Sequence, residues 1–113
     1  MKIAAETRTR RAAWTKSKLR PALRNLHFNL DTEFDNESGH LLAVYLQVRK
    51  GRAAEVLELT EGIAYANYNS GGKLLGIELL GPCKIQVLDQ ISRNEPRVIK
   101  EFLKKNIPAQ MVG

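Results

Sequence analysis

The chain has 113 residues, of which 43% are hydrophobic, with a single cysteine and a formal net charge of +6. This length suffices for one small domain with appendages, and a lone cysteine excludes an internal disulfide and fits a reducing compartment. The sequence has no apolar run long enough to span a bilayer and none typical of a secretion signal. We therefore expect a cytoplasmic protein without a membrane partner.

The positive charge is concentrated at the start of the chain. Residues 1–25 hold eight of the 18 basic side chains and one of the 12 acidic ones, which leaves ten basic and eleven acidic side chains for residues 26–113. We therefore expect a flexible basic N-terminal arm, residues 1–26, attached to a nearly neutral domain. A short helix beginning at Pro21 is also predicted.

Three interpretations of the basic arm stay open. Its Trp14 packs on the domain or on a neighbouring copy, or the arm contacts the phosphates of a nucleic acid, or the segment is an organellar transit peptide. Under the second interpretation, Trp14 stacks on a base and the cations neutralise phosphates. The predicted nucleic-acid contacts are then Arg8, Arg10, Arg11, Trp14, Lys16, Lys18 and Arg20.

Two strands are predicted directly after the arm. Residues 27–35 alternate polar and apolar side chains, which is typical of a strand with one wetted face. Residues 36–39 form a turn, and residues 40–48 are apolar on both faces, which predicts a central strand.

Residues 54–82 read as three short strands joined by two glycine turns. Gly62 interrupts the first two strands, because glycine can take the positive φ of a tight turn. Residues 69–72, Asn-Ser-Gly-Gly, predict a hairpin loop. The third strand, Lys73–Leu80, alternates and ends at Gly81-Pro82, since proline cannot donate to a ladder.

The C-terminal part predicts one further strand and a helix. Residues 84–91 fit strand and helical spacing about equally, and we favour a strand over residues 84–88. Asn94 and Pro96 predict the start of a helix, with an Arg97–Glu101 pair on its surface. Its apolar face covers the sheet or docks a partner, and it consists of Val98, Ile99, Phe102 and Leu103.

Together these elements predict an α+β fold. We expect a small antiparallel sheet of five or six strands, arranged as a meander of hairpins, in residues 27–92. A C-terminal helix and tail follow in residues 93–113.

Acidic side chains offer candidate ligands and catalytic groups. Asp31, Glu33 and Asp35 share one face of a predicted strand, where neighbouring carboxylates can hold Mg²⁺, Ca²⁺ or Mn²⁺. A solvated strand face explains the same row, and we favour it because the spacing carries no ligand geometry. Glu78 is a lone carboxylate between apolar neighbours, which fits an edge charge or a functional acid.

An enzyme is not expected. A hydrolase would combine Glu78 with one of those three acids, yet the sequence has no nucleophile–base pair, phosphate loop or metal motif. We expect no cofactor and no bound metal.

Residues 28–82 resemble a widespread prokaryotic family of small domains of unknown function. The similarity lies in Phe34-Asp35, the strand that contains Tyr45, the segment 62–68, and the closing Gly76-Ile77-Glu78. Phe34, Gly39 and Asn67 depart from the family pattern, which has tyrosine at the first position and aspartate at the others. The resemblance implies a small antiparallel sheet, no established reaction, and a site formed by Asp35, Tyr45, Gly76 and Glu78.

Members of that family often lie beside genes for small RNA-cleaving toxins. The resemblance therefore implies a regulatory or antitoxin-like role for some members. We expect a non-catalytic protein-interaction module that forms a homodimer or binds a protein partner. The alternative is a nucleic-acid-binding protein that uses residues 1–25.

Overall fold

A computed structural model of the protein describes residues 25–113. Nearly all of the basic arm, with its predicted nucleic-acid contacts and the helix predicted from Pro21, lies outside the described residues. The described part has five strands: β1 (Leu26–Phe34), β2 (Leu41–Arg49), β3 (Glu55–Thr60), β4 (Ala64–Tyr68) and β5 (Leu74–Leu79). It also has helices α1 (Ile85–Ser92) and α2 (Arg97–Asn106) and a 3₁₀ turn, η3 (Ala109–Met111).

The five strands form one antiparallel sheet in the order β1-β2-β5-β4-β3. The α+β class and the antiparallel sheet are confirmed, but a meander of consecutive hairpins is wrong, because β5 lies between β2 and β4. Residues on β2 and β5 such as Leu46 and Ile77 are fully buried. A central position gives these apolar strands neighbours on both sides, whereas the more polar β1 and β3 occupy the edges.

The turns follow the sequence signals closely. Gly62 and Gly72 both have positive φ, 68° and 78°. The Asn69 Oδ1 atom accepts hydrogen bonds from the backbone N–H groups of Gly71 and Lys73, both at 2.9 Å, which fixes the hairpin loop between β4 and β5.

The strand predicted over residues 84–88 is wrong, because residues 85–88 form the start of helix α1 and Lys84 is its N-cap residue. Helical spacing places Leu88 in the core and Ile85 and Ile91 on the same side of the helix. A strand would have pointed Ile85 and Leu88 to opposite faces. The backbone of Cys83 instead makes one isolated bridge with Val112, which closes the C-terminus against the start of α1.

Helix α2 begins later than expected. It starts at Arg97 with Pro96 in the cap position and no side-chain cap, so the helix start predicted from Asn94 is wrong because Asn94 does not cap the helix. The predicted apolar face is confirmed for Ile99 and Leu103, which are buried. Val98 from the same set is 41% exposed, and the Arg97 Nε to Glu101 Oε2 ion pair is present at 3.2 Å.

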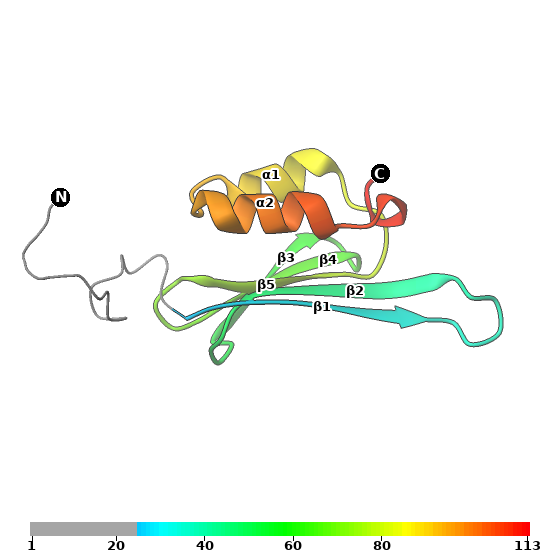
Figure 1. Cartoon of the computed structure of the whole chain (residues 1–113), viewed down its shortest axis with the longest axis horizontal. Helices are drawn as coiled ribbons and strands as arrows, with labels where there is room; N and C mark the ends of the chain where they lie inside the picture. The colour runs from blue at the N-terminus through cyan, green and yellow to red at the C-terminus, as the bar shows by residue number, and fades with distance from the viewer. Residues whose placement is uncertain (1–24) are drawn as a thin grey trace, which may run out of the picture.

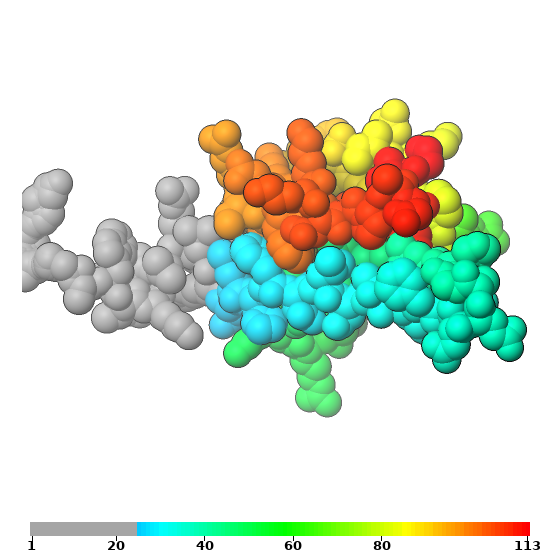
Figure 2. All heavy atoms as spheres, turned by 45° about the vertical axis from the view of Figure 1, so that its right-hand side comes forward, coloured from blue at the N-terminus to red at the C-terminus, as the bar shows by residue number. Residues whose placement is uncertain are grey.

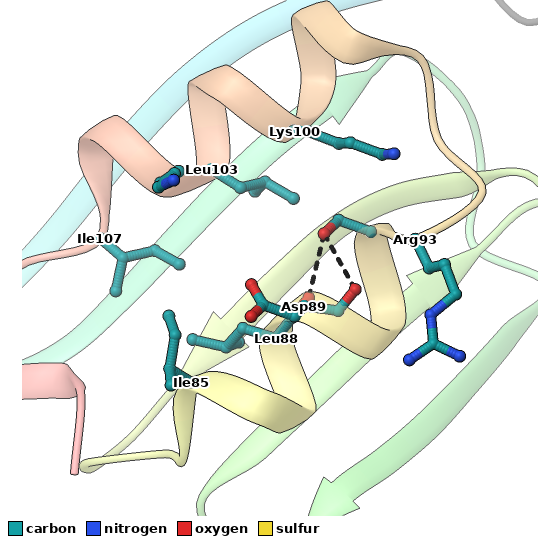
Figure 3. Close-up of a pocket in the computed structure, with 9 residues that line it drawn as sticks. Ile85, Leu88, Asp89, Arg93, Lys100, Leu103 and Ile107 are labelled. Atoms are coloured by element: carbon teal, nitrogen blue, oxygen red, sulfur yellow. Dashed lines mark hydrogen bonds between the residues drawn. The ribbon is translucent and has the colours of Figure 1, made fainter.

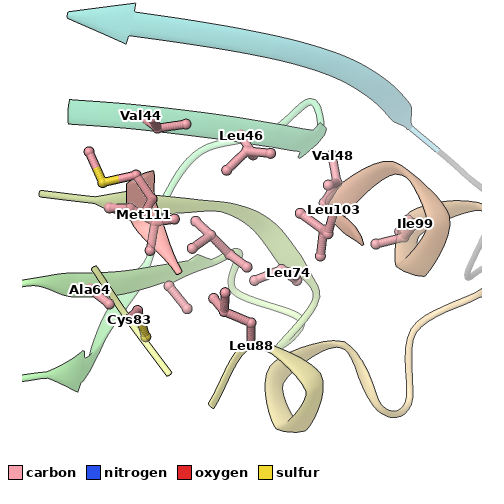
Figure 4. Packing of buried hydrophobic residues seen from close by; sticks show 13 residues of the cluster. Val44, Leu46, Val48, Ala64, Leu74, Cys83, Leu88, Ile99, Leu103 and Met111 are labelled. Atoms are coloured by element: carbon pink, nitrogen blue, oxygen red, sulfur yellow. The ribbon is translucent and has the colours of Figure 1, made fainter. Parts of the chain in front are cut away.

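Both helices cover the same face of the sheet (Figure 1). Side chains from β2, β4 and β5 meet Leu88 of α1, Ile99 and Leu103 of α2, and Met111 of η3 in one core (Figure 4). The two predicted regions 27–92 and 93–113 therefore share a single core. Its burial supplies the main stabilisation of a chain this small.

The β1–β2 hairpin extends beyond the helices at its turn (Figure 1). Figure 2 shows β1 along the side of the molecule below the helices. Phe28 stacks on Phe102 of α2, with ring centroids 4.7 Å apart. Phe34 and Leu42, further along the hairpin, are about half exposed. Neither helix of residues 25–113 has the length and apolar character needed to cross a membrane.

Candidate functional site: the helix-free face of the sheet

The sheet face opposite the helices, here called the helix-free face, carries a row of alternating acids and tyrosines. Strand pairing places Asp31 beside Tyr45, Tyr45 beside Glu78, Glu78 beside Tyr65, and Tyr65 beside Glu58. The row therefore crosses all five strands, with one residue from each. We call it the acid–tyrosine row. Neighbouring strands lie about 4.8 Å apart, so these side chains are direct neighbours.

Tyr45 is positioned by a glycine on the next strand. A Cβ atom on Gly76 would lie 2.7 Å from the Tyr45 Oη atom and 2.6 Å from the Leu46 carbonyl oxygen. No side chain other than hydrogen fits at Gly76 without a shift of the backbone. The missing side chain lets the Tyr45 phenol lie over β5, close to Glu78 on the same strand.

Tyr65 and Glu58 are joined by hydrogen bonds at the other end of the row. The Tyr65 hydroxyl donates to Glu58 Oε2 at 3.3 Å, and the Gly62 N–H donates to the same oxygen at 2.8 Å. Partial desolvation raises the pKa of Tyr65, and the negative charges of Glu58, Glu78 and Glu61 raise it further. The phenol therefore stays protonated in a negative field.

Among the paired residues of the described strands, the only Lys or Arg is Arg49, which alternates with Tyr45 and Gln47 on β2 but is 3% exposed and ion-paired with Glu95. No other Lys or Arg of these strands is paired on the helix-free face. Strand alternation assigns these residues to it: Asn29, Asp31, Glu33, Ala43, Tyr45, Gln47, Val56, Glu58, Tyr65, Asn67, Gly76 and Glu78. Four of them are acidic, two are tyrosines and three carry amides. Such a surface accepts hydrogen bonds from guanidinium and ammonium groups and offers aromatic faces for cation–π contact.

Three of the four residues of the site predicted from the family resemblance come together here. Tyr45, Gly76 and Glu78 are neighbours on β2 and β5. Asp35 is separate, because it lies in the turn beyond β1. Its Oδ1 accepts the Glu37 N–H at 2.8 Å, and hydrogen bonds from the Glu37 and Ser38 amides lower the pKa of its carboxyl. Asp35 thus shapes the hairpin turn.

The proposed metal row does not assemble around a common point. Within residues 25–113, no three His, Cys, Asp or Glu side chains gather closely enough to hold a metal ion. Asp31 accepts from the Asn29 side-chain amide at 3.0 Å, and Asp35 is engaged by its turn.

A second feature is a groove of about 560 Å³ between α1 and α2, on the side of the molecule away from the sheet (Figure 3). Leu88, Leu103 and Ile107 form apolar walls, while Arg93 and Lys100 lie at its rim. The Ser92 hydroxyl is engaged by the Leu88 and Asp89 carbonyls. The lining suits an apolar group with a negative end, and no predicted site residue lies in it.

Comparisons of the chain with protein-family models, with curated proteins and with solved structures return no match. The family resemblance of residues 28–82 therefore stays a prediction from the residues.

Sequence reasoning missed two members of the row, Tyr65 and Glu58. Their alternation within predicted strands was visible, but their meeting with Glu78 depends on strand order. The available signal was the pair of tyrosines and the acids at alternate positions of successive strands.

Proposed function

We propose that the protein is a non-catalytic interaction module whose helix-free face binds a basic polypeptide segment. The acid–tyrosine row carries this proposal, because it presents three carboxylates and two phenols side by side. The only Lys or Arg on the described strands, Arg49, is buried and already paired with Glu95. Arginine and lysine side chains match such a surface in charge, in hydrogen-bonding capacity and in their affinity for aromatic rings.

The free edge of β1 adds a second means of contact. β1 is the outer strand of the sheet and pairs only with β2 among the described strands. An extended partner can add itself to such an edge through backbone hydrogen bonds. Asp31 and Glu33 of β1 would then attract a basic strand, whereas a second copy of β1 would bring like charges close together. The edge therefore favours a basic partner over self-pairing.

The binding test uses the full chain and a fluorescent oligo-arginine peptide at low salt, followed by anisotropy. Glu78→Gln should weaken binding about tenfold, because it removes the central charge of the row. Glu101→Gln removes one charge from α2, on the other side of the molecule, and serves as the matched control. Equal affinities for the two variants, or no binding by any of the proteins, would contradict the proposal.

We extend this proposal to a regulatory, antitoxin-like role. Small RNA-cleaving toxins are often basic, so an antitoxin-like module that covers one would use an acidic face of this kind. This assignment depends on the family resemblance. Co-purification with a small basic protein encoded beside it, lost in Glu78→Gln and retained in Glu101→Gln, is the expected result.

Homodimer formation remains a separate proposal. The β3 edge exposes Val56 and Leu57, which are 58% and 46% exposed. Apolar side chains on an unpaired edge favour association with a second copy. Light scattering should then give a dimer mass, and Leu57→Lys should return the protein to a monomer.

Nucleic-acid binding is the second candidate function. The eight basic side chains of residues 1–25 favour this function. Because the acidic helix-free face repels phosphate groups, the basic arm would supply all of the contacts to the nucleic acid. Affinity for single-stranded DNA should fall steeply with salt. Replacing Arg8, Arg10 and Arg11 by glutamine should weaken this affinity by about the same factor for every DNA sequence tested.

A further inference from the structure

We infer that the helix-free face is occupied by the basic segment of the same molecule, residues 1–24, when no partner is bound. This inference rests on the proposed function, because it names a competitor for the same surface. The outside partner would then have to displace the chain's own arm before it binds.

Residues 1–24 and the helix-free face are opposite in charge. Residues 1–24 contain eight basic side chains and one acidic one, whereas residues 25–113 contain ten basic and eleven acidic ones. The acids of the folded part are not spread evenly, because Asp31, Glu33, Glu58 and Glu78 share the helix-free face. The most basic segment of the chain is therefore tethered to a domain with one acidic face.

Residues 1–24 are long enough to span the whole acid–tyrosine row. The segment joins the domain at Asn25, directly before β1. Asp31 lies six residues further along β1, or roughly 20 Å away, and the row spans roughly 19 Å across five strands. A chain of 24 residues can extend to about 80 Å, so it reaches every member of the row without strain.

The covalent link between residues 1–24 and the sheet favours their contact with the helix-free face. A segment linked to its binding surface meets it at an effective concentration in the millimolar range. Ion pairs between this segment and the helix-free face are individually weak and are screened by salt. At such an effective concentration they nevertheless compete with a free partner for the face. Asn25 has a positive φ of 61°, and its carbonyl accepts the Lys50 N–H at 2.8 Å, so the attachment point is fixed at the end of the sheet.

The experiment compares two full-length proteins. The arm variant carries Arg8, Arg10, Arg11, Lys16, Lys18 and Arg20 all replaced by glutamine. A control variant carries Lys100→Gln and Lys104→Gln on α2. We expect the arm variant to bind labelled oligo-arginine about tenfold more tightly than the natural chain, with no gain in the control variant.

The second measurement needs no peptide. Amide NMR signals of Tyr45, Tyr65 and Glu78 should differ between the natural chain and the arm variant at low salt, and the difference should vanish at high salt. It should not change on dilution. A difference that declines on dilution would assign the contact to a second copy and overturn the inference.

The outcomes separate the two proposals. Equal peptide affinity in the natural chain and the arm variant overturns the intramolecular contact and leaves the proposed function standing. If neither protein binds the peptide, the proposed function fails, and the peptide-free NMR comparison then decides the inference alone. Identical signals in both proteins would overturn it.

Discussion

The Tyr45 phenol lies so close to the backbone of Gly76 that a Cβ atom there would come within 2.7 Å of the hydroxyl oxygen. The same Cβ would lie 2.6 Å from the Leu46 carbonyl oxygen, which cannot move without its strand. Gly76→Ala should therefore lower the free energy of unfolding by about 2 kcal/mol, measured by urea denaturation.

Two further variants test the cause of that loss. Gly71→Ala is the matched control, because its Cβ would meet only the Asn69 Oδ1 atom at 3.4 Å, and its effect should stay within about 0.5 kcal/mol. Adding Tyr45→Phe to Gly76→Ala should recover part of the loss, since the carbonyl clash persists. Full stability of Gly76→Ala would contradict the described packing.

The raised pKa of Tyr65 can be traced to named neighbours. Desolvation raises this pKa first, and Glu58 raises it next, so Glu58→Gln should move the pKa down toward its ordinary value of about 10. Because the folded-state pKa is raised, the associated stability is present below pH ~10 and is lost as the pH rises through the folded-state value. The phenolate absorbance during an alkaline titration measures this shift.

Tyr68 provides the control for that titration. Desolvation raises its pKa, and Glu95 and Glu55 add to the effect. Glu55→Gln should therefore lower the pKa of Tyr68 and leave Tyr65 unchanged. If the pKa values of both tyrosines shifted in either variant, the carboxylates would act through a long-range electrostatic field and not through the local contacts described here.

The turn between β1 and β2 depends on an ionised Asp35. Hydrogen bonds from the Glu37 and Ser38 amides lower the pKa of its carboxyl. A lowered folded-state pKa gives stability that is full above pH ~4 and is lost as the pH falls through the folded-state value. Asp35→Ala should therefore lower the melting temperature at pH 7, and the deficit should shrink in acid. A deficit independent of pH would assign the effect to the side chain's shape alone.

The Arg49 guanidinium is held at the end of the sheet by the loop between the helices. Its Nη2 pairs with Glu95 Oε1 at 3.0 Å and its Nη1 donates to the Leu74 carbonyl at 2.8 Å, with the arginine only 3% exposed. Glu95→Ala should cost about 2 kcal/mol in unfolding free energy, because it removes a partner of a buried charge.

The Arg97–Glu101 pair is the comparison for that buried contact. Both side chains are largely exposed, 87% and 64%, so Glu101→Ala should cost less than about 0.5 kcal/mol. Equal losses in the two variants, measured by urea denaturation, would show that burial of Arg49 carries no energetic weight.

Much of the fold was readable because its signals are local. The alternation of polar and apolar residues predicted β1 and β5, and the apolar run of residues 40–48 predicted β2. The turn residues Gly62 and Asn69 predicted the connections between β3, β4 and β5. The position of β5 between β2 and β4 was not readable, since it depends on which apolar strands bury each other. Residues 84–88 were misassigned because five residues do not separate a period of 2 from a period of 3.6.

The candidate site shows the same division. Tyr45, Gly76 and Glu78 were predicted from the family resemblance, and strand pairing brings them together. Tyr65 and Glu58 join them only through the register of β3, β4 and β5. The family resemblance also assigned Asp35 to this site, but its carboxylate instead accepts hydrogen bonds within the turn between β1 and β2.

Binding of a basic segment to the helix-free face can be followed residue by residue in an NMR titration of the full-length protein with unlabelled oligo-arginine at low salt. We expect the signals of Asp31, Tyr45, Tyr65 and Glu78 to shift first and furthest, and added salt to reverse the shifts. Shifts confined to Lys100 and Lys104 on α2, or none at any residue, would contradict binding to this face.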